Sequence, residues 1–308
     1  MKGYLLRLAL GGAILAALVY SGKLTPSAFA SLDGADCLAL VGVAGVALLS
    51  TSLRWFVLVS PLLQRSDSAN ALATALSSNI YAFISPAGVG VDVARALALR
   101  RKGDISPAIA ASSSIVDRTL GLWGLLVYSA LVGCFAASRD PLLRLSWIAV
   151  SAAACIATAV LLVFLNPVMP LPSGVSRLIP EKLRTALALV HLRKHPRTFG
   201  MAVLLALLAA AANQALPVLA YSALTEGSVG VEQWFGGALV IIVNSFGLTP
   251  GGLGIGEAAG VQLLHATGGA EAILLTRASL ALWAAVFLLP NPTVLSWLIP
   301  ARGESHSS

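Results

Sequence analysis

The chain has 308 residues, of which 57% are hydrophobic and 11% are charged, and its mean hydropathy is +0.87. A soluble globular domain has about a quarter of its residues charged, so this composition excludes that class and indicates a protein of the lipid bilayer. The net charge of +7 calls for no nucleic-acid partner, because basic residues that flank membrane spans and attract anionic headgroups account for it.

Six apolar windows are close to or beyond the roughly 20 residues that cross a bilayer. They lie near 4–22, 37–59, 107–136, 145–165, 199–222 and 271–290. The first also fits a signal peptide, but its apolar length favours a retained span. Most Lys and Arg residues then fall on the face that both termini share, so we expect a multi-pass protein with cytoplasmic termini.

Two shorter apolar segments, 69–84 and 233–248, stop at similar phrases and then resume as helical patterns. The phrases are NIYAFISPAGVGVD at 79–92 and NSFGLTPGGLGIGE at 244–257. We expect two re-entrant helical hairpins, at about 69–102 and 233–266. Three predicted spans separate them, so they enter from opposite faces as an inverted repeat, which is typical of secondary transporters with a site near the midplane.

The predicted fold is therefore all-α: six spanning helices and two inverted re-entrant hairpins, forming a single domain over 1–300. The loop at about 166–198 has apolar residues at helical spacing among cations, which predicts an amphipathic helix on the inner membrane surface. A short cytoplasmic tail is expected at 301–308.

The breaks of the two hairpins share hydroxyl, proline and glycine residues that predict a binding site for a headgroup. These candidates are Ser85, Pro86, Gly88 and Gly90 in the first break, and Thr249, Pro250, Gly251, Gly252 and Gly254 in the second. Glycine permits positive φ and a close approach of a ligand to the backbone. The helices that resume would present free N–H groups and a positive dipole end to an anion such as phosphate.

Charged residues inside the apolar windows need a partner or a cavity. Asp92 and Glu257 begin the resumed helices and either cap them or take part in transport. Arg118 lies about 16 Å into its window at 1.5 Å per residue, which makes it the main substrate-binding candidate. The alternative is a structural pair of Arg118 with Asp117, Asp92 or Glu257.

The remaining polar candidates have less specific signals. Arg277 aligns with Arg118 and joins the substrate-binding set, although its shallower position also predicts snorkelling toward the surface, as does that of Arg54. Asn79 and Asn244 occupy matching places before the breaks, where they either tie the broken ends to the backbone or contact lipid. We interpret Arg95 as part of a cytoplasmic basic cluster.

No set of nucleophile, base and orienting group can be assembled from the sequence, and we expect neither an enzyme nor a cofactor. His191 and His195 have the spacing of a metal pair but lack the Glu of an H-E-x-x-H pattern. No metal site is predicted.

The segments SSNIYAFISPAGVGVDVARALALRRKG, SSSIVDRTLGLWG and NSFGLTPGGLGIGEAAG resemble the flippase-like family typified by the membrane half of lysylphosphatidylglycerol synthases. The resemblance covers roughly residues 5–295. It implies a lipid-translocation domain of a bacterial inner membrane, in which the motif arginine corresponds to Arg118 and the acidic residues correspond to Asp92 and Glu257. The chain ends at ARGESHSS, so it resembles a stand-alone member without the aminoacyltransferase domain.

Three functions follow from these observations. The first is a flippase for an anionic or zwitterionic phospholipid; the resemblance also implies a prenyl-phosphate-linked lipid or a hopanoid as candidate substrates. The second is a membrane scaffold that recruits a separate lipid synthase, and the third is a membrane-embedded lipid-modifying enzyme. The sequence is also compatible with a homo-oligomer.

Overall fold

A computed structural model describes most of the chain, namely residues 2–63, 68–85, 88–101, 107–135, 141–165, 195–225, 229–246, 249–264 and 268–289. Within these ranges the chain folds into helices and contains no strand, which confirms the all-α prediction. The predicted surface helix lies outside the described residues, apart from 195–198, and so does the predicted tail at 301–308.

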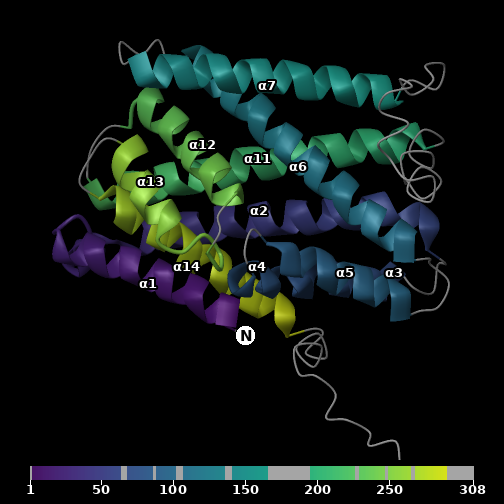
Figure 1. The fold of residues 1–308 in the computed structure, drawn as a ribbon, viewed down its shortest axis with the longest axis horizontal. Helices are drawn as coiled ribbons and strands as arrows, with labels where there is room; N and C mark the ends of the chain where they lie inside the picture. Colours follow the sequence, from purple (N-terminus) through teal and green to yellow (C-terminus); the bar gives the residue numbers. More distant parts are fainter. Residues whose placement is uncertain are drawn as a thin grey trace, which may run out of the picture.

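The helices fall into a long and a short set (Figure 1). The long helices are α1 (Lys2–Tyr20), α2 (Gly34–Val59), α6 (Pro107–Phe135), α7 (Pro141–Leu165), α11 (Pro196–Thr225) and α14 (Gly269–Leu288). The short helices are η1 (Pro26–Ser31), η2 (Ser60–Leu62), α3 (Ser68–Ser77), η4 (Ser78–Ile80), α4 (Tyr81–Ile84), α5 (Val89–Arg101), α12 (Val231–Ser245) and α13 (Ile255–Leu263).

Five helical stretches in the described ranges are long and apolar enough to cross a membrane. They are Gly34–Leu62, Ala111–Phe135, Leu143–Leu162, Pro196–Thr225 and Gly269–Leu288. These correspond to five of the six predicted spans. The sixth predicted span forms α1, of which the described apolar part, Ala9–Tyr20, is shorter than a bilayer crossing. Its crossing of the membrane stays a prediction.

Helix α11 occupies the centre of the bundle and packs on α2, α6, α12 and α14. Its contact with α6 depends on small residues: a Cβ at Gly124 would lie 2.8 Å from the carbonyl oxygen of Ala206. Such close approaches allow van der Waals packing where lipid removes the hydrophobic driving force. The central helices therefore form a tightly packed frame around the two broken helices.

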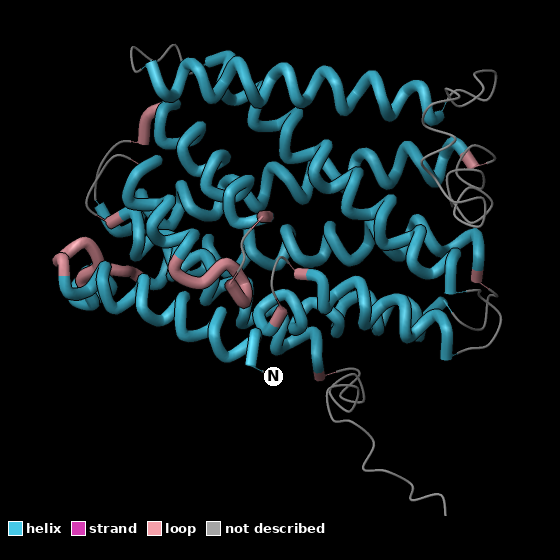
Figure 2. Tube along the Cα trace, viewed as in Figure 1, coloured by secondary structure: helices cyan, strands magenta, loops and turns pink. Residues whose placement is uncertain are grey.

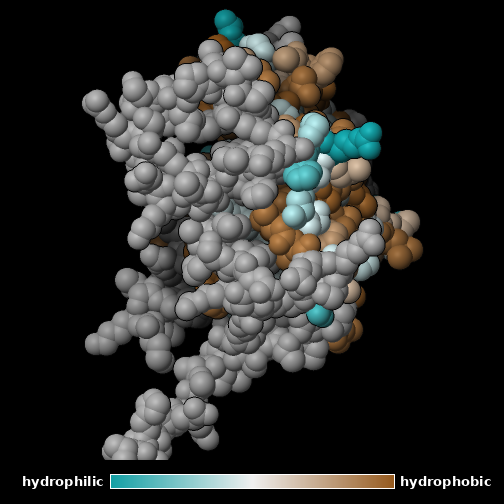
Figure 3. All heavy atoms as spheres, turned by 90° about the vertical axis from the view of Figure 1, so that its right-hand side faces the viewer, coloured by the Kyte–Doolittle hydropathy of each residue, from teal (hydrophilic) through white to brown (hydrophobic). Residues whose placement is uncertain are grey.

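Apolar side chains also cover the outside of the bundle. Helix α7 lies at one edge and packs on α6 (Figure 1), while its Leu145, Ile156 and Leu162 side chains are exposed. Seen from the end of the molecule, brown apolar surface lies beside a few hydrophilic residues (Figure 3). An exterior of this kind is suited to contact with lipid tails.

The two predicted hairpins appear as broken helices that extend in opposite directions. Helices α3 and α5 extend toward the right-hand end of Figure 1, and α12 and α13 lie toward the left-hand end. Loop segments lie within the helical bundle near its middle (Figure 2). This arrangement fits two hairpins that enter from opposite faces, although their re-entrant topology in a bilayer and the inverted repeat stay predictions.

Candidate functional site

A cavity of about 590 Å³ lies between the two broken helices and the frame of α2, α6, α11 and α14. Most of its lining is apolar, but ionisable side chains of both signs reach its wall. The charged lining residues are Arg54, Asp92, Arg95, Asp117, Arg118 and Arg277. Ligand pockets usually enclose about 300–1,000 Å³ and combine apolar walls with a few placed polar groups. The cavity therefore has the size and the chemistry of a binding site.

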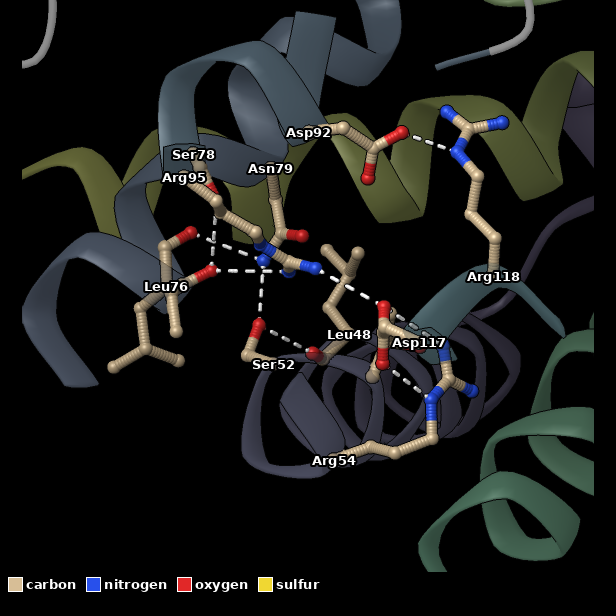
Figure 4. Close-up of polar contacts among 12 residues, drawn as sticks. Leu48, Ser52, Arg54, Leu76, Ser78, Asn79, Asp92, Arg95, Asp117 and Arg118 are labelled. Carbon is tan, nitrogen blue, oxygen red and sulfur yellow. Dashed lines mark hydrogen bonds and ion pairs between the residues drawn. The ribbon is translucent and has the colours of Figure 1, made fainter. Parts of the chain in front are cut away.

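Asp92 on α5, in the first broken helix, and Arg118 on α6 form an ion pair. The Nε of Arg118 donates to Oδ2 of Asp92, and the two side chains face each other apart from the deeper polar cluster (Figure 4). The Arg118 side chain is 38% exposed and that of Asp92 is 19% exposed. Of the three partners considered for Arg118, the structure selects Asp92, and it leaves the guanidinium accessible from the cavity.

Asp117, the residue before Arg118, binds two arginines in a buried cluster. Its Oδ1 accepts from Nε of Arg54 at 2.7 Å, and its Oδ2 accepts from Nη2 of Arg54 at 3.2 Å and from Nη1 of Arg95 at 3.3 Å. Arg95 also donates through Nε to Ser78 Oγ at 3.1 Å, and its guanidinium lies 5.3 Å from the Trp55 ring centroid. These bonds fix both arginines in the wall of the cavity (Figure 4).

The cluster corrects two interpretations made from the sequence. Arg54 does not snorkel to the surface, because its side chain is 6% exposed and makes a two-pronged contact with Asp117. Arg95 does not belong to a cytoplasmic cluster, since only 1% of it is exposed. The carboxylate of Asp117 inside an apolar window indicates that it needs cationic partners. The sequence does not identify them, because Arg54 and Arg95 are 63 and 22 residues away along the chain.

Side chains of the first broken helix tie its ends together. The amide of Asn79 donates to Ser52 Oγ at 2.7 Å and to the Leu76 carbonyl at 3.0 Å, so it bonds the backbone one turn earlier on the same side of the break and links this helix to α2. Ser85 Oγ donates to the Tyr81 carbonyl at 2.7 Å and accepts from the Gly90 amide at 2.8 Å. Ser85 thus bridges the break directly.

Glycines and a proline complete the first break. Gly88 has a φ of +66°, which a residue with a side chain rarely adopts. A Cβ at Gly90 would lie 2.8 Å from Ser85 Oγ, so this glycine permits the close approach. Pro86 lies outside the described residues.

In the second break the acidic residue has a clear structural role. Glu257 is fully buried, and its Oε2 accepts from the Gly254 amide at 2.6 Å, so it caps α13. The expectation of a free amide at this helix terminus is therefore wrong for Gly254. Nη2 of Arg277 lies 3.2 Å from Oε1 of Glu257 and donates to the Gly252 carbonyl at 3.2 Å. Arg277 therefore does not snorkel outward, and it points into the break.

Several polar atoms at the second break have no hydrogen-bond partner among the described residues. They include Oδ1 of Asn244, Oγ1 of Thr249 and Nη1 of Arg277. The side chain of Asn244 packs against the turn, because a Cβ added at Gly256 would lie only 2.8 Å from the side-chain amide nitrogen of Asn244. The Pro250 carbonyl accepts from the Leu253 amide at 3.1 Å and closes the turn. Unpaired buried polar atoms are uncommon in folded proteins, and this group of them gathers at the second break.

The two breaks contact each other beside the cavity. The Gly251 amide donates to the Ser85 carbonyl at 3.4 Å. Gly251 has a φ of +58°, and a Cβ there would lie 3.4 Å from the Cα of Phe83. The turns of the two broken helices therefore touch through backbone, with almost no side chain between them.

Ion pairs of the same type follow the two breaks, each joining an acidic residue near the start of the resumed helix to an arginine of the next long helix. Asp92 pairs with Arg118, and Glu257 pairs with Arg277. The pairs differ in access, because Glu257 is fully buried whereas Asp92 is partly exposed. Of the two pairs, the first is the one that the cavity leaves more accessible.

The conformation of the second break can be tested at Gly252. We expect Gly252→Ala to lower stability by about 1–2 kcal/mol, the order of magnitude for a side chain forced into the left-handed region. Gly252 has a φ of +73°, and an added Cβ would also clash with Oδ1 of Asn244. The measurement is the thermal unfolding midpoint of the purified protein in mild detergent.

The matched control is Gly42→Ala on α2, where an added Cβ meets nothing within 4 Å. Alanine is the better helix former by about 0.5–1 kcal/mol, so this variant should unfold at the same temperature or slightly higher. Equal midpoints for the two variants would contradict the described turn.

The described ranges contain no group of three or more His, Cys, Asp or Glu residues placed to hold a metal ion. His195 is exposed at the start of α11, and His191 lies outside the described residues. The polar groups of the cavity are instead mainly guanidinium, carboxylate and amide groups, which suit a ligand with charged and hydrogen-bonding groups of its own.

The family model of the lysylphosphatidylglycerol synthase TM region matches residues 4–289. No curated protein matches the chain, and no solved structure matches it. The match agrees with the resemblance carried by the two glycine phrases and the Arg118 motif, and it covers both broken helices and all five candidate spans. The chain is therefore a polytopic membrane protein of the lysylphosphatidylglycerol synthase TM region family, which links it to lipid handling.

Proposed function

We propose that the protein moves a lipid between the leaflets of a bacterial inner membrane. The headgroup, bearing a phosphate, enters the cavity between the two broken helices while the acyl chains stay in the bilayer. In this proposal the lipid leaves the cavity chemically unchanged. The observation that carries it is a cavity of about 590 Å³ whose mainly apolar wall carries four arginines, inside an apolar helical bundle.

The chemistry of the cavity supports a phosphate ligand. Guanidinium groups recognise phosphate through charge-assisted hydrogen bonds, which are stronger than neutral ones. Arg118 is the accessible donor, since more than a third of its side chain is exposed. Its bond to Asp92 also supplies an internal counter-charge when no ligand is present, which lowers the cost of keeping an arginine at this depth.

Side chains, more than backbone amides, carry the proposed recognition. The Gly90 amide binds Ser85, and the Gly254 amide binds Glu257. These two amides are thus satisfied within the protein. We therefore assign the helix ends a positioning role and the headgroup contacts to Arg118 and its neighbours.

The distribution of basic residues supports the proposed orientation with cytoplasmic termini. The C-terminal end of α5, which carries Arg101, and the N-terminal end of α11, which carries Arg197, lie at the same end of the bundle (Figure 1). Cytoplasmic segments near spans collect Lys and Arg, so we assign this end to the cytoplasm. Access to the cavity from this end would load lipid from the inner leaflet.

The test is transfer of fluorescent phospholipids in vesicles that contain the purified protein. A membrane-impermeant reductant bleaches only the outer leaflet, and we expect protein-containing vesicles to lose the protected inner-leaflet signal faster than empty vesicles. Vesicles with heat-denatured protein are the control. Bleaching no faster than in empty vesicles, for a panel of anionic and zwitterionic lipids, would contradict translocation and favour the scaffold for a separate synthase.

The same vesicles separate translocation from catalysis. Extracted lipids should have the same mass after incubation as before it. A protein-dependent change of headgroup mass would replace transport with the enzyme alternative.

A further inference from the structure

We infer that the cavity selects headgroups with a net negative charge and disfavours headgroups that carry an extra ammonium group. The selecting group is the buried cluster of Arg54, Asp117 and Arg95, which has one positive charge in excess. This inference rests on the proposed function in taking the cavity as the headgroup site, and it narrows the substrate class of that site.

The excess follows from the pairing of the charges. Arg118 has Asp92 as its own carboxylate, and Arg277 has Glu257. Arg54 and Arg95, in contrast, share the single carboxylate of Asp117. Among the described residues, the cavity wall and its ion partners therefore contain one guanidinium without a carboxylate of its own.

The geometry places the available donor on Arg54. Nε, Nη1 and Nη2 of Arg95 donate to Ser78, Asp117 and the Ala75 carbonyl, respectively. Arg54 uses Nε and Nη2 for Asp117, and within the described part of the chain its Nη1 donates to no other residue.

The packing of α6 directs this donor toward the cavity. A Cβ at Gly121, which lines the cavity, would lie 3.2 Å from Nη1 of Arg54 and 3.0 Å from Nη2. Because Gly121 has no side chain, the Arg54 guanidinium fits closely against α6 at a point where both residues line the cavity. Nη1 can therefore donate to an anion in the cavity.

Burial makes the excess positive charge energetically unfavourable when no counter-charge is bound. The side chains of Arg54 and Arg95 are 6% and 2% exposed, so water screens them poorly, and a lone charge in such surroundings is unfavourable. A headgroup with net negative charge supplies the missing counter-charge. A zwitterionic headgroup supplies it only in part, and an added ammonium introduces a second positive charge that is repelled.

The experiment measures binding to the purified full-length protein in mild detergent. The probe is fluorescent phosphatidylglycerol, displaced by unlabelled phosphatidylglycerol, by added phosphatidylcholine, or by lysylated phosphatidylglycerol. We expect phosphatidylglycerol to bind with a Kd at least about tenfold lower than the others, the effect of one charge-assisted contact. Lysylated phosphatidylglycerol should displace the probe least.

Two substitutions of Arg54 separate charge from structure. Arg54→Gln leaves Asp117 with Arg95 as a balanced pair, and it should bring the apparent affinities of phosphatidylglycerol and phosphatidylcholine close together. Arg54→Lys retains the positive charge and should keep the wild-type order. Arg144→Gln, at an exposed position on α7, is the matched control and should leave the order unchanged.

The order of affinities in the wild-type protein decides the question even if a variant fails to fold. Equal displacement by phosphatidylcholine, or stronger displacement by lysylated phosphatidylglycerol, would overturn the inference. Displacement by glycerol phosphate as effective as displacement by the lipid would show a site for a free phosphate ester instead. Selective binding without transfer in vesicles would refute translocation alone, whereas transfer without selectivity would refute only this inference.

Discussion

Arg118→Ala is expected to reduce lipid transfer in vesicles by about tenfold or more, because it removes the accessible charge-assisted donor of the cavity. The remaining arginines can replace it only in part, since Arg54 leaves a single donor, Nη1, for the cavity, while Arg95 is fixed to Asp117 and Arg277 is directed into the second break. The rate of fluorescence loss in protein-containing vesicles measures the effect. Arg144→Ala, which removes an exposed arginine of α7, should leave the rate unchanged.

A double substitution distinguishes a binding residue from a structural pair. If Arg118 serves only to neutralise Asp92, then removing both charges in Arg118→Ala with Asp92→Asn should restore transfer. We expect the double variant to stay inactive, because the headgroup has lost its donor. Recovery of transfer would make the pair structural and would move the headgroup site elsewhere in the cavity.

Asp117→Asn is expected to have the largest effect on stability. It leaves the guanidinium groups of Arg54 and Arg95 buried beside each other with no carboxylate between them. Breaking a buried ion pair by removing one partner typically costs about 3–5 kcal/mol. The unfolding midpoint in detergent and the yield of monodisperse protein should both fall sharply.

The control for this substitution is Asp33→Asn, at the N-cap of α2. The Asp33 side chain accepts from the Asp36 amide at 2.7 Å, and asparagine caps helices about as well as aspartate. Its stability should therefore be close to that of the wild type. Adding Arg54→Gln to Asp117→Asn should recover part of the loss, and no recovery would mean that unbalanced charge is not the cause.

The spans were predictable because they depend on local composition. About 20 apolar residues form a helix in a bilayer whatever surrounds them, since backbone groups in lipid must bond within the segment. Five windows accordingly correspond to five long helices. The interruptions were predictable for a similar reason, because Gly88, Gly251, Gly252 and Gly254 adopt positive φ values that residues with side chains rarely adopt.

The partners of the charged residues were not predictable in the same way. The sequence identified Arg118 as a deep charge that needs a partner, but three carboxylates were equivalent candidates until the helices were placed in space. The prediction that Arg54 snorkels to the surface was wrong because it used only the distance from the end of the apolar window. That distance does not reveal which face of the helix points inward. Side-chain direction depends on packing between helices, which a single sequence does not specify.

The weak contact between Gly251 and Ser85 has a mechanical consequence. At 3.4 Å it is a long hydrogen bond, while the ion pair of each half joins only elements of that half. Moving the two turns apart would break this one weak backbone bond and leave both ion pairs intact, while α14 keeps its packing on α2, α3 and η4. The turns can therefore shift relative to each other without disturbing the charged pairs behind them.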